Sequence, residues 1–255
     1  MLLHGFPENL HIWDEFASGI AKNFRVITID LPGFGQSECI GYVHTMELMA
    51  QCVREVMRAL KLRRYVLAGH SMGGYAGLAL AELYGENLSG LCLFHSSSYA
   101  DSEAKKAERG RSIEAVRKHP AQYLKSFAGN MFADTDDAHA RKLADIIAST
   151  TPRGIIAALQ GMKIRPQREV ILKFAGFPVL FIWGKKDKLL NYADMLPQAE
   201  APADKEILLL ENAGHMGFYE APEETLQALK KFANRCFKTP GRQAAVRARP
   251  HTEKP

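Results

Sequence analysis

Residues 68–77 read AGHSMGGYAG and place one serine, Ser71, among four glycines. A glycine inside a helix or strand costs about 0.5–1 kcal/mol relative to alanine, so this density indicates a backbone that needs room or unusual torsions. Ser71 follows the apolar strand candidate Tyr65–Gly69 and precedes the helix candidate Met72–Tyr84. A sharp strand-to-helix turn there would lift the hydroxyl above the strand end. A glycine-rich turn with an incidental serine is the alternative interpretation of these residues alone.

Apolar, β-branched runs alternate with segments of helical period along the chain, which is the pattern of a parallel sheet covered by helices. We therefore expect an α/β fold with a mostly parallel central sheet. The strand candidates are Arg25–Asp30, Tyr65–Gly69, Gly90–His95, Pro178–Gly184 and Glu206–Glu211, and Glu223–Phe237 is a further helix candidate.

The alternation stops once, at residues 96–177, where only helical stretches follow one another. This segment is far longer than a crossover between parallel strands requires. We expect a core formed by residues 1–95 and 178–237, with residues 96–177 inserted as a helical cap at one end of the sheet. Residues 238–255 are basic, lack apolar periodicity and contain three prolines, so we expect a disordered tail.

The net charge of the 255 residues is +5, and four of these charges belong to the predicted tail. The body is nearly neutral, so we expect neither a nucleic-acid partner nor stable membrane association. The four cysteines show no CxxC spacing, which predicts no disulfide framework. The first residues lack the features of a signal peptide, and we expect a cytoplasmic protein. The oligomeric state stays open.

A serine is a weak nucleophile unless a base removes its proton and an acid orients that base. In an open parallel sheet these groups must lie beyond the carboxyl ends of the strands. Asp187 follows the strand that ends at Trp183, and His215 lies in the loop after the last strand. The chain order Ser71, Asp187, His215, each after a separate strand, predicts a catalytic triad.

Acyl transfer also needs N–H donors for the developing oxyanion. The backbone N–H of Met72, directly after the serine, is one candidate, and that of Phe6 in the segment LLHGFPEN is the other. Pro7 carries no N–H. Only three residues precede His4.

The segments HGFPEN, DLPGFGQS, GHSMGG, WGKKD and GHMGFYEAPE together resemble those of the α/β-hydrolases with a helical cap, over roughly Met1–Phe237. The resemblance implies the α/β-hydrolase fold. In that family further strands precede the one that leads into the HG motif, so we expect either that upstream residues belong to this protein or that its sheet lacks those first strands. HGFPE also resembles epoxide hydrolases and fluoroacetate dehalogenases, but these carry an aspartate at the position of Ser71. A serine there implies an acyl-enzyme ester rather than attack on an epoxide or a carbon–halogen bond. Some relatives place the acid after the preceding strand, where this chain has His95.

Several further residues are candidates for an acyl pocket. No cofactor is implied, and the histidines show no metal-ligand spacing. The segment LPGFGQSE lacks the third glycine of a dinucleotide-binding loop, so we expect no nucleotide site. The candidate substrate-binding residues are Phe34, His95, Tyr99, Met131, Phe132, Leu189 and Met216.

These observations predict a serine hydrolase that cleaves carboxylic esters of small to medium acyl groups, with a small-molecule ester as its partner. A lactonase or enol-lactonase, a C–C bond hydrolase and a thioesterase would use the same triad and stay as alternatives. A non-catalytic ligand receptor with this fold is the alternative from another class. Turnover of a short p-nitrophenyl ester separates an enzyme from a receptor.

Overall fold

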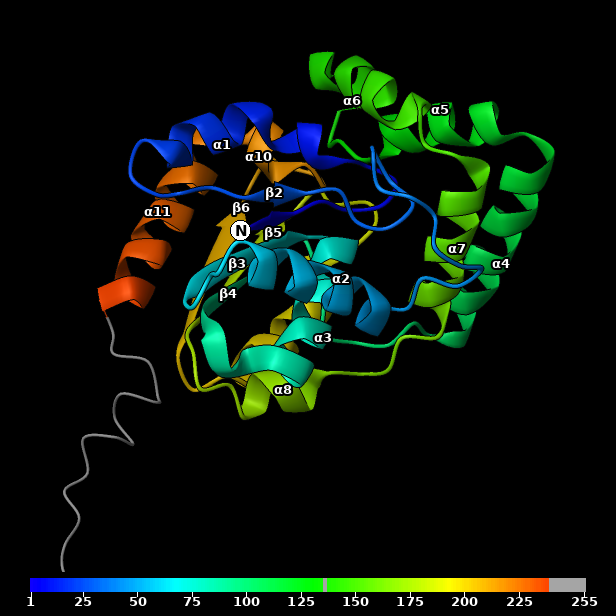
Figure 1. Ribbon diagram of the computed structural model, residues 1–255. Helices are drawn as coiled ribbons and strands as arrows, with labels where there is room; N and C mark the ends of the chain where they lie inside the picture. Colours follow the sequence, from blue (N-terminus) through cyan, green and yellow to red (C-terminus); the bar gives the residue numbers. More distant parts are fainter. Residues whose placement is uncertain (135–136, 239–255) are drawn as a thin grey trace, which may run out of the picture.

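The computed structural model describes residues 1–134 and 137–238 (Figure 1). Within them, six strands form one sheet in the order β2-β1-β3-β4-β5-β6, with every neighbouring pair parallel. The predicted α/β architecture with a parallel sheet is confirmed. The strands are β1 (Leu2–Leu3), β2 (Thr28–Ile29), β3 (Tyr65–His70), β4 (Leu88–Phe94), β5 (Val179–Gly184) and β6 (Lys205–Leu210).

The strand predicted at Arg25–Asp30 is shorter than expected, since only Thr28–Ile29 pair in the sheet. β2 is an edge strand whose one neighbour, β1, offers just Leu2 and Leu3 for pairing. The strand that leads into His4 lies inside the sheet, between β2 and β3. The other predicted strands are present, with ends that differ by one or two residues.

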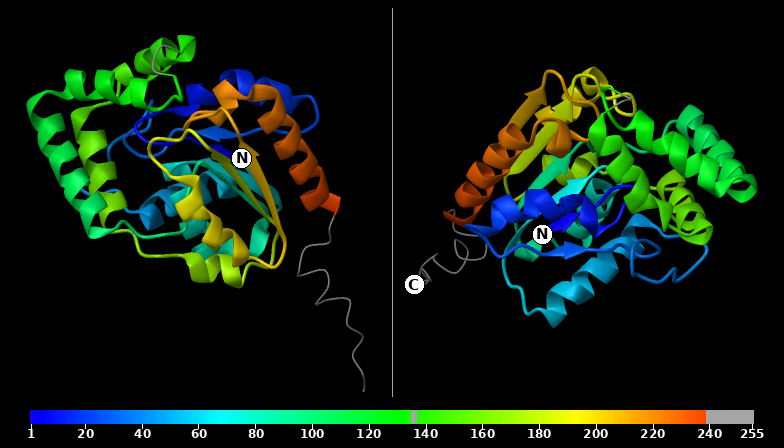
Figure 2. Two further views of the ribbon diagram at one scale, coloured as in Figure 1. Left: turned by 180° about the vertical axis from the view of Figure 1, so that it is seen from behind. Right: turned by 90° about the horizontal axis from the view of Figure 1, so that it is seen from above.

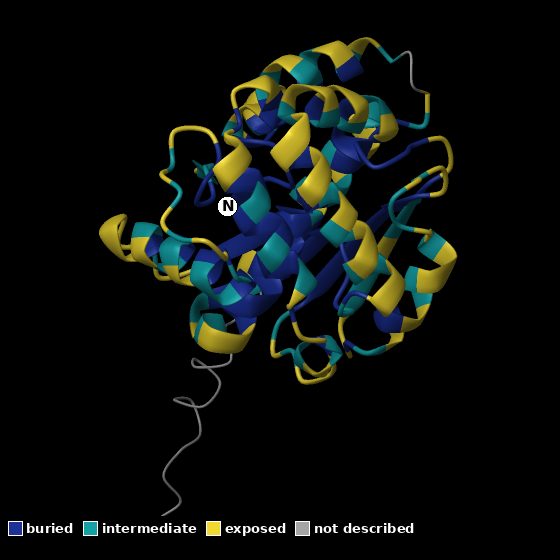
Figure 3. Cartoon of the chain, turned by 90° about the vertical axis from the view of Figure 1, so that its right-hand side faces the viewer, coloured by how far each residue is buried: buried dark blue, intermediate teal, exposed yellow. Residues whose placement is uncertain are grey.

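Helices cover both faces of the sheet (Figures 1 and 2). On one face, α1 (Asp14–Ala21) packs on α11 (Pro222–Lys238), which contacts β4. On the other, α3 (Met72–Tyr84) contacts β3 and packs between α2 (Met46–Ala59) and α8 (Glu169–Lys173). Figure 3 shows the result: the central strands and the inner helix faces are buried, and the outer helix faces are exposed.

Four helices between β4 and β5 form a separate group at one end of the sheet (Figure 1). They are α4 (Glu103–Lys118), α5 (Pro120–Asn130), α6 (Ala138–Ala148) and α7 (Pro152–Lys163). Each helix begins at a residue that favours a helix N-terminus. The N-cap residues of α4, α6 and α7 are Ser102, Asp137 and Thr151, and Pro120 is the first residue of α5. The last helix of the predicted insertion, α8, packs instead on α3.

Short helices complete the chain: η1 (Leu10–Trp13), η2 (Gly85–Asn87), α9 (Tyr192–Met195), η3 (Leu196–Glu200) and α10 (Gly217–Glu220). Of the predicted tail, Lys238 is the last residue of α11, and residues 239–255 lie outside the described residues. No helix in the described ranges combines the length and apolar character needed to cross a bilayer.

Candidate active site

Ser71 lies at the turn between β3 and α3 with φ 49° and ψ −114°, a left-handed conformation that is costly for a residue with a side chain. Its N–H donates to Phe94 O at 2.9 Å, and its carbonyl accepts from Ser96 Oγ at 2.7 Å. The flanking glycines have no space for a side chain: a Cβ on Gly69 would lie 2.4 Å from Gly73 O. The tight turn inferred from the glycines is therefore present, with Ser71 in the strained position.

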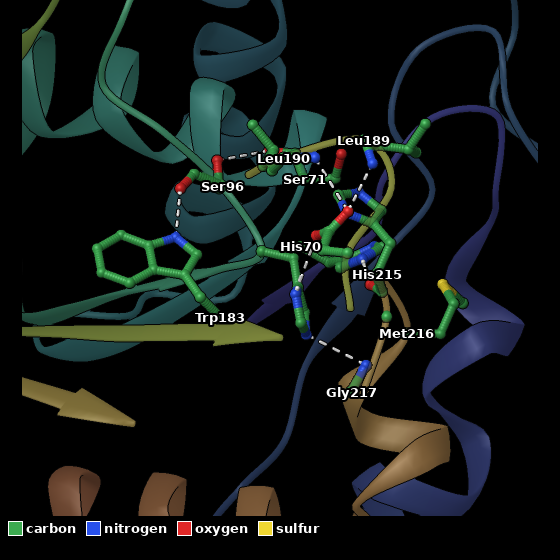
Figure 4. A network of polar contacts seen from close by, with 12 residues as sticks. His70, Ser71, Ser96, Trp183, Leu189, Leu190, His215, Met216 and Gly217 are labelled. Carbon is green, nitrogen blue, oxygen red and sulfur yellow. Dashed lines mark hydrogen bonds and ion pairs between the residues drawn. The ribbon is translucent and has the colours of Figure 1, made fainter. Parts of the chain in front are cut away.

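Asp187 and His215 meet at this end of the sheet. His215 Nδ1 lies 2.6 Å from Asp187 Oδ2, while Asp187 Oδ1 accepts the N–H groups of Leu189 at 2.8 Å and Leu190 at 3.0 Å (Figure 4). Burial alone would raise the pKa of Asp187, but His215 and His95 beside it hold that pKa well below its usual value. The ionised carboxylate orients the His215 ring.

His215 presents its other ring nitrogen as a free base. Because Nδ1–H faces Asp187, Nε2 carries the lone pair, and Nε2 is buried with no hydrogen-bond partner among the described residues. The His215 backbone is fixed from both sides: its N–H donates to Met131 O at 2.8 Å and its carbonyl faces His70 Nε2 at 2.8 Å. Ser71 and His215 line the same cavity.

His95 is a second histidine on the same carboxylate. It is fully buried at the end of β4, with φ 47°, and its Nδ1 lies 3.3 Å from Asp187 Oδ2. Gly217 N–H donates to His95 Nε2 at 3.2 Å, so the ring proton must sit on Nδ1, toward Asp187 (Figure 4). Burial lowers the pKa of His95 to about 4, so the ring is neutral.

The ring nitrogens of His95 and His215 and the carboxylate of Asp187 are also the kind of donors that bind metal ions. In this structure Asp187 instead forms a hydrogen bond with His215, and His95 Nδ1 approaches the same carboxylate oxygen at 3.3 Å. Both rings face the same oxygen, Oδ2, and the His215 contact of 2.6 Å is a direct short hydrogen bond. The His95 nitrogen that faces Asp187 carries a proton, so it has no lone pair for a metal.

A buried ion pair links the serine turn to the loop after β1. His70 Nδ1 lies 3.0 Å from Glu8 Oε2, and its Nε2 faces the His215 carbonyl. Both partners are acceptors, so both nitrogens carry protons and His70 is an imidazolium. Burial would lower the pKa of His70, but Glu8 and the His215 carbonyl outweigh it and raise that pKa. Glu8 Oε2 also accepts Gly5 N–H at 2.6 Å.

The two candidate oxyanion donors lie on elements held together by this network. Met72 is the first residue of α3, where backbone N–H groups have no partner within the helix. Phe6 follows Gly5 in the loop after β1 and lines the cavity with Ser71. Neither N–H has an acceptor among the described residues. Their oxyanion role stays a prediction.

The cavity over Ser71 has a volume of about 400 Å³ and is walled by residues of α4, α5, α7 and α9. Of the predicted pocket residues, Tyr99 and Leu189 lie on its wall. The other five are buried elsewhere: His95 faces Asp187, and Phe34 packs edge-on against Phe6. The residues that the structure does not place on this wall are Phe34, His95, Met131, Phe132 and Met216.

A family model described as alpha/beta hydrolase fold matches residues 1–222. The chain belongs to this family. It is similar to a thermophilic esterase from Thermogutta terrifontis, solved with malate bound, at 31% identity and a TM-score of 0.87, over 92% of this chain and 89% of that one.

Two curated relatives extend the comparison. One is the dihydrolipoyllysine-residue acetyltransferase component of an acetoin cleaving system from Pseudomonas putida, 28% identical over 91% of this chain, which spans 62% of that relative's length. The other is epoxide hydrolase 3 from Xenopus tropicalis, 26% identical over 93% of this chain and 71% of the relative. The family and the hydrolases among these neighbours make the protein a hydrolase.

Sequence reasoning did not find the charged residues of the site. Glu8 and His70 lie inside quoted motifs, yet nothing in the spacing predicts that they form a buried pair across 62 residues. Arg109 and Arg165, on the cavity wall, come from cap segments without a recognisable motif. Their one common signal was that both lie in the insertion, Arg109 within a helical stretch and Arg165 just after one, which is too common a feature to single them out.

Proposed function

We propose that the protein hydrolyses carboxylic esters of small to medium acyl groups through an acyl-enzyme intermediate. The observation that carries the proposal is a strained serine that shares one cavity with the free Nε2 of His215. A carboxylate nucleophile, which epoxide opening of the kind discussed above would use, is not available at this turn because the residue is Ser71.

The cytoplasmic location expected from the sequence also stays a proposal; all four cysteines are described and none forms a disulfide.

In the first half-reaction, Ser71 Oγ attacks the ester carbonyl carbon while His215 Nε2 takes the hydroxyl proton. The carbonyl oxygen becomes an oxyanion that the N–H groups of Phe6 and Met72 bind. Asp187 holds the ring tautomer and stabilises the imidazolium. Collapse of the intermediate breaks the bond to the alcohol oxygen, which receives the proton from His215.

In the second half-reaction, a water molecule gives its proton to His215 Nε2 and adds to the acyl carbon. The new oxyanion uses the same donors, and its collapse breaks the bond to Ser71 Oγ, which regains the proton. The products are the free acid and the regenerated serine. Every proton moves through one nitrogen, which is why its lack of any competing partner matters.

The test is the Ser71→Ala variant with a short p-nitrophenyl ester as substrate. We expect kcat to fall by about 10⁴-fold or more with an unchanged melting temperature, because the side chain removed is small and catalytic residues act as a unit. A fluorophosphonate should label Ser71 in the wild-type protein, as seen by peptide mass. Ser112→Ala, which removes another hydroxyl from the cavity wall, is the matched control.

Near wild-type turnover by Ser71→Ala would overturn the proposal. The alternative reactions also need Ser71 and His215, so the variants do not distinguish them from ester hydrolysis. A panel of lactones, thioesters and vinylogous diketones makes this distinction. The substrate with the highest kcat/KM identifies the reaction class.

A further inference from the structure

Two arginines of the cap face the cavity that holds Ser71 and His215. Arg109 lies on α4 and Arg165 follows the end of α7. Their side chains are only 12% and 6% exposed. Such burial is rare for an arginine unless an acidic partner or ligand compensates its charge.

The described residues supply one carboxylate for these two guanidinium groups. Asp101 Oδ1 accepts Arg165 Nη1 at 2.6 Å and Arg109 Nη2 at 3.3 Å, and its Oδ2 accepts Arg109 Nε. Asp101 is itself 2% exposed. Burial would raise the pKa of Asp101, but the two arginines outweigh it and keep that pKa low, so the cluster carries one surplus positive charge.

Among the other charged residues on the wall, Glu108 also attracts Arg109, but Glu108 pairs with Lys105, so these two add no net charge. Lys105 and Glu108 pair with each other at 3.0 Å and are 33% and 52% exposed, at the rim. Asp194, on α9, is exposed. Solvent screens these rim charges far more than the buried cluster.

Arg165 is held rigidly with unused donor capacity. Its guanidinium carbon lies 3.9 Å from the centroid of the Tyr75 ring, and Nη1 also donates to Met162 O at 3.0 Å. Its Nε is buried and has no hydrogen-bond partner among the described residues. A fixed guanidinium at a cavity wall is suited to bind a planar anion such as a carboxylate.

We infer that Arg109 and Arg165 bind a carboxylate of the substrate, so that the protein prefers esters or lactones that carry a free carboxylate a few bonds from the reacting carbonyl. This inference rests on the proposed function and names its substrate class. Asp101 keeps both guanidinium groups in place and leaves one charge for the ligand. Either the acyl or the alcohol part of the ester can supply this carboxylate.

The first experiment compares matched substrates that differ only in charge. Monoethyl adipate and its primary amide carry the group on the acyl side; the acetate esters of 4-hydroxybutanoate and 4-hydroxybutanamide carry it on the alcohol side. We expect kcat/KM to favour the carboxylate by about 10- to 100-fold in at least one pair, mostly through KM, since a hydrogen bond to a charged group contributes about 1.5–3 kcal/mol. Ratios near one in both pairs overturn the inference.

The second experiment tests the two arginines. In Arg165→Met and Arg109→Gln the preference for the carboxylate should fall to near one, while Arg165→Lys should retain part of it. Arg111→Gln, an exposed arginine on the same helix, is the control and should keep the wild-type ratio. An unchanged ratio in folded Arg165→Met and Arg109→Gln, as judged by circular dichroism, contradicts the assignment.

Ligand binding to the inactive Ser71→Ala variant tests the carboxylate site independently of the proposed esterase activity. Calorimetry should detect adipate but not adipamide, and Arg165→Met should weaken that binding by about tenfold or more. If neutral esters are hydrolysed but adipate does not bind, the carboxylate site is wrong and the esterase proposal stands. If no ester is hydrolysed but adipate binds through Arg165, the esterase proposal fails and the site stands.

Discussion

The rings of His70, His95 and His215 form a triangle: the centroids of His70 and His95 lie 5.0 and 5.5 Å from that of His215 and 6.1 Å from each other. His70 and His95 carry different charges. His70 faces two acceptors and is an imidazolium, whereas His95 accepts from Gly217 N–H and is neutral. The hydrogen-bond partners, rather than burial, make the difference, because both rings are fully buried. Each histidine therefore has its own measurable effect on the site.

Replacement of His95 should change the behaviour of His215, the candidate general base. In His95→Phe, Asp187 Oδ2 faces His215 alone, so the carboxylate stabilises the His215 imidazolium more strongly. The acid limb of the pH profile of kcat/KM should move to higher pH, and kcat should fall by roughly tenfold as Asp187 loses one of its fixed neighbours. An unchanged profile and rate would show that His95 only fills space.

For His70 the expected effect is on stability against pH. Its folded pKa lies above the ordinary 6.5, so its contribution is complete below pH 6.5 and is lost as pH rises through the folded value. The pKa of Glu8 lies below the ordinary 4.5, so its contribution is present above that value and is lost at lower pH. The pair should therefore stabilise most between about pH 4.5 and 6.5.

Denaturant unfolding across this range tests the His70 assignment. His70→Gln should lower the free energy of unfolding at pH 6 by about 3–5 kcal/mol, because it leaves Glu8 buried and unpaired. It should also remove the decline in stability above pH 6.5 that we expect for the wild type. His11→Gln, at an exposed pair with Asp14, is the control. A wild-type protein without that decline contradicts a charged His70.

At the scale of elements, α7 joins the cap to the core by backbone contact. A Cβ on Gly161 would lie 1.6 Å from His44 O, and one on Gly154 would lie 2.1 Å from Gly33 O. His44 N–H also donates to Ala157 O at 2.9 Å. α7 thus lies directly on the loop after β2. Because Arg165 comes just after the end of α7, the same contact helps to fix the position of Arg165.

Gly161→Ala should force α7 away from this loop and lower the free energy of unfolding by about 1–3 kcal/mol, as overpacking does. The comparison is Gly110→Ala on α4, where no atom beyond the backbone of the helix itself lies within 4 Å of the added Cβ. That change should stabilise by about 0.4–1 kcal/mol, since alanine favours the helix. Equal melting temperatures for the two variants would show that the α7 contact tolerates a side chain.

At the scale of the whole molecule, the catalytic candidates could be predicted from the sequence because functional residues of a parallel sheet lie just after the carboxyl ends of its strands. Ser71 and Asp187 follow the buried strands β3 and β5, and His215 follows the half-buried edge strand β6, so the parallel sheet brings the three residues to one edge. The extent of β2 could not be predicted, because it depends on how few residues β1 offers. The packing of α8 on α3 and the two arginines over the cavity depend on tertiary contacts of helices that carry no motif.

One such tertiary contact connects the end of the insertion to both helices on that face of the sheet. Arg168 is 4% exposed, pairs with Glu47 on α2 and Glu82 on α3, and donates its N–H to Ser98 O at 2.7 Å. The two carboxylates are 35% and 41% exposed, so solvent screens much of the attraction. Even so, removal of the buried cation leaves two acidic groups facing one apolar side chain.

We therefore expect Arg168→Met to lower the free energy of unfolding by about 1–3 kcal/mol, between the values for an exposed pair and a buried one. The loss should be larger at low salt, because the unpaired carboxylates repel each other, and adding Glu82→Gln to Arg168→Met should recover part of it. Arg58→Met, which removes an exposed partner of Glu55, should cost less than about 0.5 kcal/mol. If Arg168→Met and Arg58→Met unfold at the same denaturant concentration, the insertion is held to α2 and α3 by its apolar contacts rather than by this arginine.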